Sequence, residues 1–246
     1  MIFDAVDLTL LPNLCKKIGL NDLVKNGSRV AIKINLAKYP QINNPKTDPT
    51  LLSSTIKLVN SMGGHVTIIE CANGFLEENL RLIGLGNDFD AGLFEILDLD
   101  FEDTEEIIAA DGEIHFLPKC LKQFDVRIAI PVASLRENHV FSNNVKLFIG
   151  IVPRCHYQTG DHTTWRPRIH ENLSRSISNI YTLLNMYSPF HFYINGGNTF
   201  IRDRVNMERL PRYYVSDNGY ELDLYLLQAL DIVVPQYLKM CQPNCM

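Results

Sequence analysis

Residues 28–37 have the sequence SRVAIKINLA and residues 65–71 have the sequence HVTIIEC, and these two apolar stretches decide the fold. Between them, Asp48 followed by Pro49 predicts the start of a helix, since Asp is a good N-cap and Pro suits the first helical turn. Apolar residues then recur at helical spacing until Gly63-Gly64 ends the run. A strand, a capped helix and a second strand in this order predict a right-handed βαβ unit with parallel strands.

The rest of the chain predicts further elements of both kinds. Helices are expected at residues 76–85, 89–97, 170–185 and 219–232, with a terminal turn at 235–239. Strands are expected at 124–133, 190–195 and 213–216, and Asp111-Gly112 is expected to turn a hairpin between 105–110 and 113–117. Residues 134–168 are expected to form a long polar loop, interrupted by one short apolar run at 145–152. Together these elements predict a single α/β domain over residues 1–246, with a Rossmann-like, mixed and mostly parallel sheet covered by helices on both faces.

Composition excludes several classes of protein. The chain has 246 residues, 46% of them hydrophobic and 21% charged, which is typical of a folded globular protein. Its net charge of −5 argues against broad binding to nucleic acids or to anionic membranes. It has neither an apolar run of about 18 residues nor a basic leader, so a cytoplasmic location is expected. The six cysteines form no C-x-x-C motif, so we expect reduced thiols.

Polar residues collect where the predicted strands end. In open α/β sheets, ligands bind beyond the carboxyl ends of the strands, so these residues predict one site. They are Lys33 and Asn35, Glu70, Arg136 and His139, and Asn195 with Gly196. Lys33 and Asn35 are two residues apart and so project from one face of their strand. A purely structural ion pair between Lys33 and Glu70 is the alternative interpretation.

The segment 134–168 is locally basic within an acidic chain. It contains Arg136, Lys146 and Arg166, and arginine is well suited to binding carboxylate or phosphate. An anionic small molecule is therefore the expected ligand. His156, Asp161 and His162 form a candidate metal site, but their spacing matches no zinc signature and the nearby arginines oppose a cation. The sequence contains no G-x-G-x-x-G motif after the first strand, no phosphate-binding P-loop and no G-x-S-x-G motif.

An ordered set of motifs resembles the family known as domain of unknown function 362, over about residues 28–234. The set comprises VAIKIN at 30–35, Thr47-Asp48-Pro49, VTIIE at 66–70, the strand at 126–131 followed by His139, Lys146 and Gly150, then Asn195-Gly196, Asp217 and Asp223. The sequence departs from the family at Val132, where many relatives have lysine, at Leu147 in place of asparagine, and at Asn195 in place of an acid. Many relatives also carry a ferredoxin-like module, so the resemblance implies iron–sulfur chemistry nearby, with a ferredoxin-like partner.

Three hypotheses of function follow. In the first, the chain is an enzyme that acts on a small anionic molecule, with His139 as general acid/base beside Lys33. The substrate would be held by Asn35, Glu70, Arg136, Lys146, Arg166, Asn195 and Gly196. In the second, it is a redox or metal-associated accessory protein, linked to an iron–sulfur cluster or to nickel. A variant by architectural analogy is a racemase-like use of a nickel-containing cofactor on a hydroxy acid. In the third, it is a non-catalytic binding module or scaffold.

Overall fold

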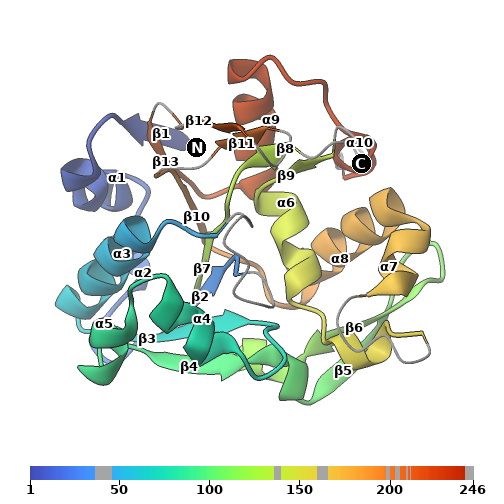
Figure 1. Ribbon diagram of the computed structural model, residues 1–246, viewed down its shortest axis with the longest axis horizontal. Helices are drawn as coiled ribbons and strands as arrows, with labels where there is room; N and C mark the ends of the chain where they lie inside the picture. Colours follow the sequence, from blue (N-terminus) through green and yellow to red (C-terminus); the bar gives the residue numbers. More distant parts are fainter. Residues whose placement is uncertain are drawn as a thin grey trace.

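The computed structural model describes residues 1–36, 46–135, 140–159, 166–197, 200–202, 206–208, 210 and 212–241. Within these ranges, the largest sheet has seven strands in the order β1-β13-β10-β7-β2-β3-β4 (Figure 1). Its strands are β1 (Ile2–Ala5), β2 (Arg29–Ile34), β3 (His65–Glu70), β4 (Glu95–Asp98), β7 (Val126–Ile130), β10 (Phe192–Asn195) and β13 (Tyr213–Ser216).

The large sheet is mixed and mostly parallel, which confirms the predicted fold class. β2 pairs in parallel with both β3 and β7, and the outer pairs β3–β4 and β7–β10 are parallel as well. β13 is antiparallel to both of its neighbours, β1 and β10. Among the described strands of this sheet, β13 alone therefore runs against the others.

The βαβ unit forms as the sequence predicts. Helix α3 (Pro49–Ser61) joins β2 to β3, and the Leu51 backbone N–H donates a hydrogen bond of 2.9 Å to the Asp48 carboxylate at its N-cap. The helix ends at Ser61 and is followed by Gly63, whose φ of +82° is one that few residues other than glycine adopt readily. Capping, apolar spacing and the terminal glycine thus agree on one local structure.

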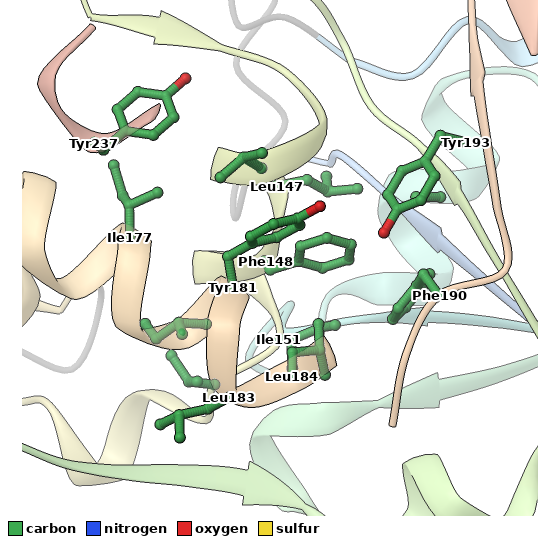
Figure 2. Packing of buried hydrophobic residues seen from close by; sticks show 14 of the residues in the cluster. Leu147, Phe148, Ile151, Ile177, Tyr181, Leu183, Leu184, Phe190, Tyr193 and Tyr237 are labelled. Carbon is green, nitrogen blue, oxygen red and sulfur yellow. The ribbon is translucent and has the colours of Figure 1, made fainter. Parts of the chain in front are cut away.

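Helices cover both faces of the sheet, and each face has its own apolar core. One core contains Val30, Ile32 and Ile34 of β2 and packs against α1 (Leu11–Lys17), α2 (Leu20–Leu23), α3, α4 (Leu76–Leu82) and the start of α5 (Gly86–Asp90). The other contains Ala31 of β2 and packs against α6 (Asn144–Leu147), α7 (Pro167–Glu171), α8 (Leu173–Tyr187), α9 (Gly219–Ala229) and α10 (Gln236–Met240). Figure 2 shows the aromatic part of this second core, where Phe148 lies against Tyr181 and Phe190.

Two smaller sheets flank the large one. Strands β5 (Thr104–Ile108) and β6 (Ile114–Pro118) form an antiparallel hairpin, and Gly112 in its turn has a φ of +85°, as Asp111-Gly112 predicts. A four-stranded sheet has the order β12-β11-β8-β9, made by β8 (Ser134–Leu135), β9 (Phe141–Ser142), β11 (Phe200–Arg202) and β12 (Asn206–Glu208). The remaining short elements are the 3-10 helices η1 (Leu8–Leu10), η2 (Leu99–Phe101), η3 (Lys119–Gln123), η4 (Phe148–Gly150) and η5 (Arg154–His156).

Two expectations need correction. The helix predicted at 89–97 is wrong, because α5 ends at Asp90 and residues 95–98 form β4, paired in parallel with β3. Gly92, with a φ of +69°, separates the two elements. The described part of 134–168 contains β8, β9, α6, η4 and η5 instead of one polar loop. Phe141, Phe148 and Ile151 are buried there and belong to the same core as Ala31 of β2, so the segment packs against the large sheet.

The structure holds no helix, in the ranges described, with both the length and the apolar character needed to cross a bilayer.

Candidate functional site

The strand order reverses between β2 and β7. From β2 the chain moves outward through β3 to β4, then returns to place β7 on the other side of β2 and β10 beyond it. In open α/β sheets such a reversal opens a crevice at the carboxyl ends of the two strands, where ligands commonly bind. The ends of β2 and β7 are therefore the first candidate site of this fold.

Thr47 connects the two strand ends at this reversal. Its hydroxyl donates a hydrogen bond of 2.7 Å to the Ile130 carbonyl and accepts one of 2.8 Å from the Asn35 backbone N–H. Its own N–H donates to the Asn35 carbonyl at 2.9 Å. One buried side chain thus fixes the ends of β2 and β7 and the start of α3 relative to one another.

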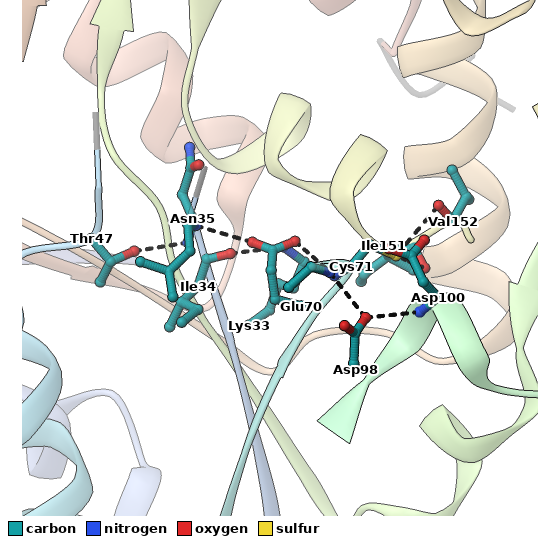
Figure 3. Close-up of polar contacts among 12 residues, drawn as sticks. Lys33, Ile34, Asn35, Thr47, Glu70, Cys71, Asp98, Asp100, Ile151 and Val152 are labelled. Atoms are coloured by element: carbon teal, nitrogen blue, oxygen red, sulfur yellow. Dashed lines mark hydrogen bonds and ion pairs between the residues drawn. The ribbon is translucent and has the colours of Figure 1, made fainter. Parts of the chain in front are cut away.

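Lys33 and Glu70 meet in the interior behind this edge. Lys33 is 0% exposed and donates hydrogen bonds of 2.8 Å to Glu70 Oε1 and 2.7 Å to the Ile34 carbonyl (Figure 3). The Glu70 carboxylate also accepts from the backbone N–H of Cys71 at 2.9 Å and of Leu36 at 3.2 Å. Burial lowers the pKa of the Lys33 ammonium, and the Glu70 carboxylate opposes that shift. The ion pair considered from the sequence is therefore present.

Gly150 lies directly over this pair. A Cβ atom at residue 150 would lie 2.9 Å from Glu70 Oε1 and 3.0 Å from Lys33 Nζ. The Gly150 carbonyl also accepts a hydrogen bond of 3.3 Å from the Cys71 backbone N–H. A glycine is needed here because the backbone at the end of η4 approaches two buried charged side chains closely.

Two buried arginines flank the chain after β3. Arg154 forms an ion pair with Asp100 and donates a hydrogen bond of 2.6 Å to the Cys71 carbonyl. Arg166 donates from Nε to the Val152 carbonyl at 2.7 Å, and its buried Nη2 has no hydrogen-bond partner among the described residues. Burial raises the pKa of the Cys71 thiol between them to about 11, although Arg166 opposes that shift. Cys71 is thus a protonated, buried thiol at neutral pH.

Asp98 and Asp100 hold the turn that follows β3. Asp98 accepts hydrogen bonds from the backbone N–H groups of Ala72 at 2.9 Å and Gly74 at 2.6 Å, and Asp100 accepts one of 2.9 Å from that of Asn73. Asp98 also accepts a hydrogen bond of 3.1 Å from the Asp100 backbone N–H (Figure 3). Asn73 has a φ of +53°, so this turn is bent in a way that needs such support. These two acids were not predicted, because they follow the stretch 89–97 that was assigned to a helix, and no strand or turn was expected around them.

A second buried network centres on Asp223 of α9. Its carboxylate accepts hydrogen bonds from the side chain of Asn143 at 2.9 Å, the backbone and side chain of Asn144 at 3.1 and 2.9 Å, and the backbone of Val145 at 3.0 Å. Asp223 therefore caps the N-terminus of α6. Burial raises its pKa to about 7, although the four donors oppose that shift.

Asn195 belongs to this network. It is 1% exposed, and its amide donates a hydrogen bond of 2.9 Å to Asn144 Oδ1. Gly196 beside it has a φ of +148°, and a Cβ there would lie 2.4 Å from the Tyr213 ring. Both residues, predicted to bind substrate, have these packing and pairing roles in the described structure.

Of the other predicted site residues, Asn35 and Lys146 are described and four lie outside the described ranges. Asn35 is partly exposed at the end of β2, and its side chain extends away from Thr47 and Glu70 (Figure 3). That amide has no hydrogen-bond partner in the part of the chain described here. Lys146 is half-buried on α6. The four residues outside the described ranges are Arg136, His139, Asp161 and His162.

His156, proposed as a metal ligand, lies against the hairpin. Its ring stacks on Phe116 with centroids 4.0 Å apart, and Nε2 lies 3.0 Å from the Thr104 hydroxyl. Burial lowers the pKa of His156, which favours the neutral ring. Among the described residues, no three His, Cys, Asp or Glu side chains are grouped so that they could hold a metal ion. The described residues therefore do not form a site for a metal ion or an iron–sulfur cluster.

Comparison with known proteins identifies the family. The model of the family described as "Domain of unknown function (DUF362)" matches residues 30–227, which run from β2 into α9. This chain belongs to the DUF362 family. The DUF362 match includes Lys33, Glu70, Gly150 and Asp223, whereas β1, α1 and α2 precede it.

The fold of this DUF362 chain is similar to that of a protein of known structure, the lactate racemase apoprotein from Thermoanaerobacterium thermosaccharolyticum. The two structures have a TM-score of 0.50, and the sequences are 15% identical. The similarity covers 91% of this chain but 55% of the racemase chain, so this chain spans little more than half the length of that protein. No curated protein matches the sequence. At this identity the likeness concerns the fold alone.

Proposed function

We propose that this DUF362 protein is an enzyme that binds a small anionic molecule, bearing a carboxylate or a phosphate, beyond the carboxyl ends of β2 and β7. The observation that carries the proposal is the reversal of strand order there, with Thr47 fixing both strand ends. The Asn35 amide, partly exposed at that point, offers a donor and an acceptor to a ligand.

The charges behind this edge support an anion as the ligand. Glu70 and Asp100 neutralise Lys33 and Arg154 respectively. Arg166 has no ion-pair partner among the described residues, and its buried Nη2 has no hydrogen-bond partner there. A buried guanidinium with no ion-pair partner among the described residues favours a nearby anion, since an unpaired buried charge is costly and Arg binds carboxylate or phosphate well.

Each residue has a proposed role. Asn35 would hydrogen-bond the ligand, and His139, which lies outside the described ranges, would be the general acid/base. Lys33 is covered by Gly150, so we propose that it acts through Glu70 as a positioning residue that holds the strand ends in place. Lactate, named for the structurally similar racemase, is a small carboxylate, which makes hydroxy acids the first class of substrate to test.

Thermal stability tests this proposal. The full chain would be heated with L-lactate, D-lactate or inorganic phosphate, and with propane-1,2-diol as the uncharged match to lactate. An anion at about 100 times its Kd should stabilise the fold by about 2.7 kcal/mol, whereas the diol should not. For a domain of this size, that corresponds to a rise in Tm of about 5–10 °C.

Two variants locate the binding. Asn35→Ala should weaken the anion that binds by about tenfold, which corresponds to the loss of one hydrogen bond to a charged group. Asn87→Ala should leave the affinity unchanged. Asn87 is exposed on α5, and α5 packs with the core that contains Ile32. Equal stabilisation by the diol, no stabilisation by any of the anions, or unchanged affinity of Asn35→Ala would contradict the proposal.

A further inference from the structure

A second cavity lies between the β5–β6 hairpin and the helices α7 and α8, away from the reversal of strand order. Its volume is about 380 Å³, within the range of small-molecule sites. It is lined by residues of the hairpin, of the chain around η5, and of the two helices. Nothing in the proposed anion site uses these residues.

The walls of the cavity are held in place from two sides. On the helix side, Arg175 donates a hydrogen bond of 2.6 Å to Asp111 in the hairpin turn, and Asn179 donates one of 2.8 Å to Glu113. On the other side, the Tyr157 hydroxyl accepts a hydrogen bond of 3.0 Å from the Phe116 backbone N–H. The cavity is therefore part of the folded architecture and is formed before any ligand arrives.

Carboxylates predominate in the lining. Glu106, Glu113 and Glu171 line the cavity, against one guanidinium, that of Arg168. Glu113 is already engaged by Asn179 and lies 3.7 Å from Arg175, but Glu106 and Glu171 form no ion pair with any described residue. The local field thus favours a positively charged group.

The buried hydroxyl of Ser176 indicates that the ligand is polar. Ser176 of α8 lines the cavity and is 1% exposed, yet its Oγ has no hydrogen-bond partner among the described residues. Buried polar atoms are nearly always hydrogen-bonded, so an unpartnered hydroxyl on the wall of a cavity is an acceptor that a ligand can use. Phe116 and Ile169 supply an apolar surface beside it.

We propose that this cavity binds a small organic cation with a primary ammonium group. The ammonium would donate to Ser176 Oγ and to the carboxylates of Glu106 and Glu171, and the apolar part of the molecule would lie against Phe116. No group of three metal-ligating side chains exists in the described ranges, so the charge is assigned to an ammonium ion instead of a metal. Glu113 adds a third negative charge to the lining, although its carboxylate already accepts a hydrogen bond from Asn179.

Calorimetric titration of the full chain with benzylamine tests this inference, with benzyl alcohol as the uncharged isostere. Benzylamine should bind saturably near neutral pH, where it is protonated, and benzyl alcohol should bind at least tenfold more weakly. Ser176→Ala should weaken benzylamine by at least tenfold without lowering the thermal stability of the free protein, since it removes a hydroxyl that has no partner among the described residues. The double variant Glu106→Gln, Glu171→Gln should weaken benzylamine at least as much.

Two controls separate this site from other effects. Glu78→Gln removes an exposed acid on α4, on the other core, and should leave benzylamine binding unchanged. Asn35→Ala, which disrupts the proposed anion site, should also leave it unchanged, so the two proposals can fail separately. Benzyl alcohol binding as tightly as benzylamine, no saturable binding of benzylamine, or Ser176→Ala and the double glutamate variant both binding like the unmodified chain would overturn the inference.

Discussion

The Lys33 ammonium donates a hydrogen bond of 2.8 Å to the Glu70 carboxylate, with both side chains buried beneath Gly150. This contact joins the ends of β2 and β3 to the backbone that follows α6, three segments that are distant in sequence. Since each carboxylate oxygen of Glu70 also accepts a backbone N–H, the pair is fully integrated into the strand ends. Its energetics are therefore the first property to measure.

Replacing Lys33 by Met should destabilise the protein strongly. The substitution keeps an unbranched side chain that is one atom shorter, but it removes the ammonium that pairs with the buried Glu70 carboxylate. Breaking a buried pair in this way costs about 3–5 kcal/mol, which chemical denaturation would measure as a loss in the free energy of unfolding. Lys57→Met, at an exposed lysine 4.0 Å from Asp88, should cost less than about 1 kcal/mol. The double variant Lys33→Met, Glu70→Leu should recover part of the loss, and equal costs for Lys33→Met and Lys57→Met would contradict this account.

Gly150→Ala should also be destabilising, by about 1–3 kcal/mol, because the added methyl group overpacks the Lys33–Glu70 pair. Gly86→Ala provides the matched control. At Gly86, too, φ is compatible with alanine, but the nearest atom is Cγ of the flexible Arg81 side chain, at 3.3 Å. Thermal unfolding should show a clear loss of Tm for the first variant and little change for the second. An unchanged Tm for Gly150→Ala would contradict this prediction, because it would mean that the backbone at the end of η4 can move away from the pair.

The parts of the fold that could be predicted are those with strong local signals. The helix between β2 and β3 has an N-cap, a proline, regular apolar spacing and a terminal glycine, and all of these indicate the same structure. The ion pair could also be predicted, because Lys33 stands between isoleucines in a strand that is buried on both faces. An unpaired lysine there would be too costly, so a partner was to be expected.

The rest of the structure could not be predicted, because it depends on short segments or on contacts between segments that are distant in the sequence. β4 has only four residues, and its parallel pairing with β3 overrides the helical spacing of the stretch around it. The contact of Asn143 and Asn144 with Asp223 could not be predicted, because the three residues form one buried network only when α9 is placed against α6. Asp223 itself was named in the sequence analysis, but only as part of the stretch that resembles the family and without its partners. Arg136, His139, Asp161 and His162 lie outside the described residues, so their predicted roles stay predictions.

Asp223 should make stability depend on pH in the direction opposite to an ordinary ion-paired acid. Its pKa is about 7 in the folded protein, above the value of about 3.9 expected for Asp in the unfolded chain. Between these two values the folded state binds more protons than the unfolded state, so the contribution of Asp223 to stability is lost as the pH rises. The slope from this one group is at most about 1.4 kcal/mol per pH unit.

Asp223→Asn tests both the network and its titration. The variant places an amide donor among four N–H donors and should cost about 1–3 kcal/mol near neutral pH. The cost should grow as the pH is lowered toward about 4, since only the unmodified protein gains stability there. Glu221→Gln, on the exposed side of the same helix, should change stability little at any pH. A cost of Asp223→Asn that does not change with pH would show that the Asp223 carboxyl does not titrate in this range.

Asn195→Asp should be destabilising near neutral pH and less so in acid. The new carboxylate would face Asn144 Oδ1, which now accepts a hydrogen bond from the Asn195 amide at 2.9 Å. Two acceptors in contact, close to the buried Asp223, should cost about 1–3 kcal/mol in denaturation experiments. At lower pH the protonated acid can donate to Asn144 and restore the contact. Asn87→Asp, at an exposed position, should show no comparable effect; equal costs for the two variants would refute the pairing.

The proposed function requires an anion to bind beyond the ends of β2 and β7. A crystal structure of the full chain soaked with L-lactate, and a second with inorganic phosphate, tests it most directly. We expect the carboxylate or phosphate to lie within hydrogen-bond distance of the Asn35 side-chain amide, at the point where Thr47 connects the two strands. Anion density only elsewhere, such as the cavity between the hairpin and α8, with nothing at the ends of β2 and β7, would contradict it.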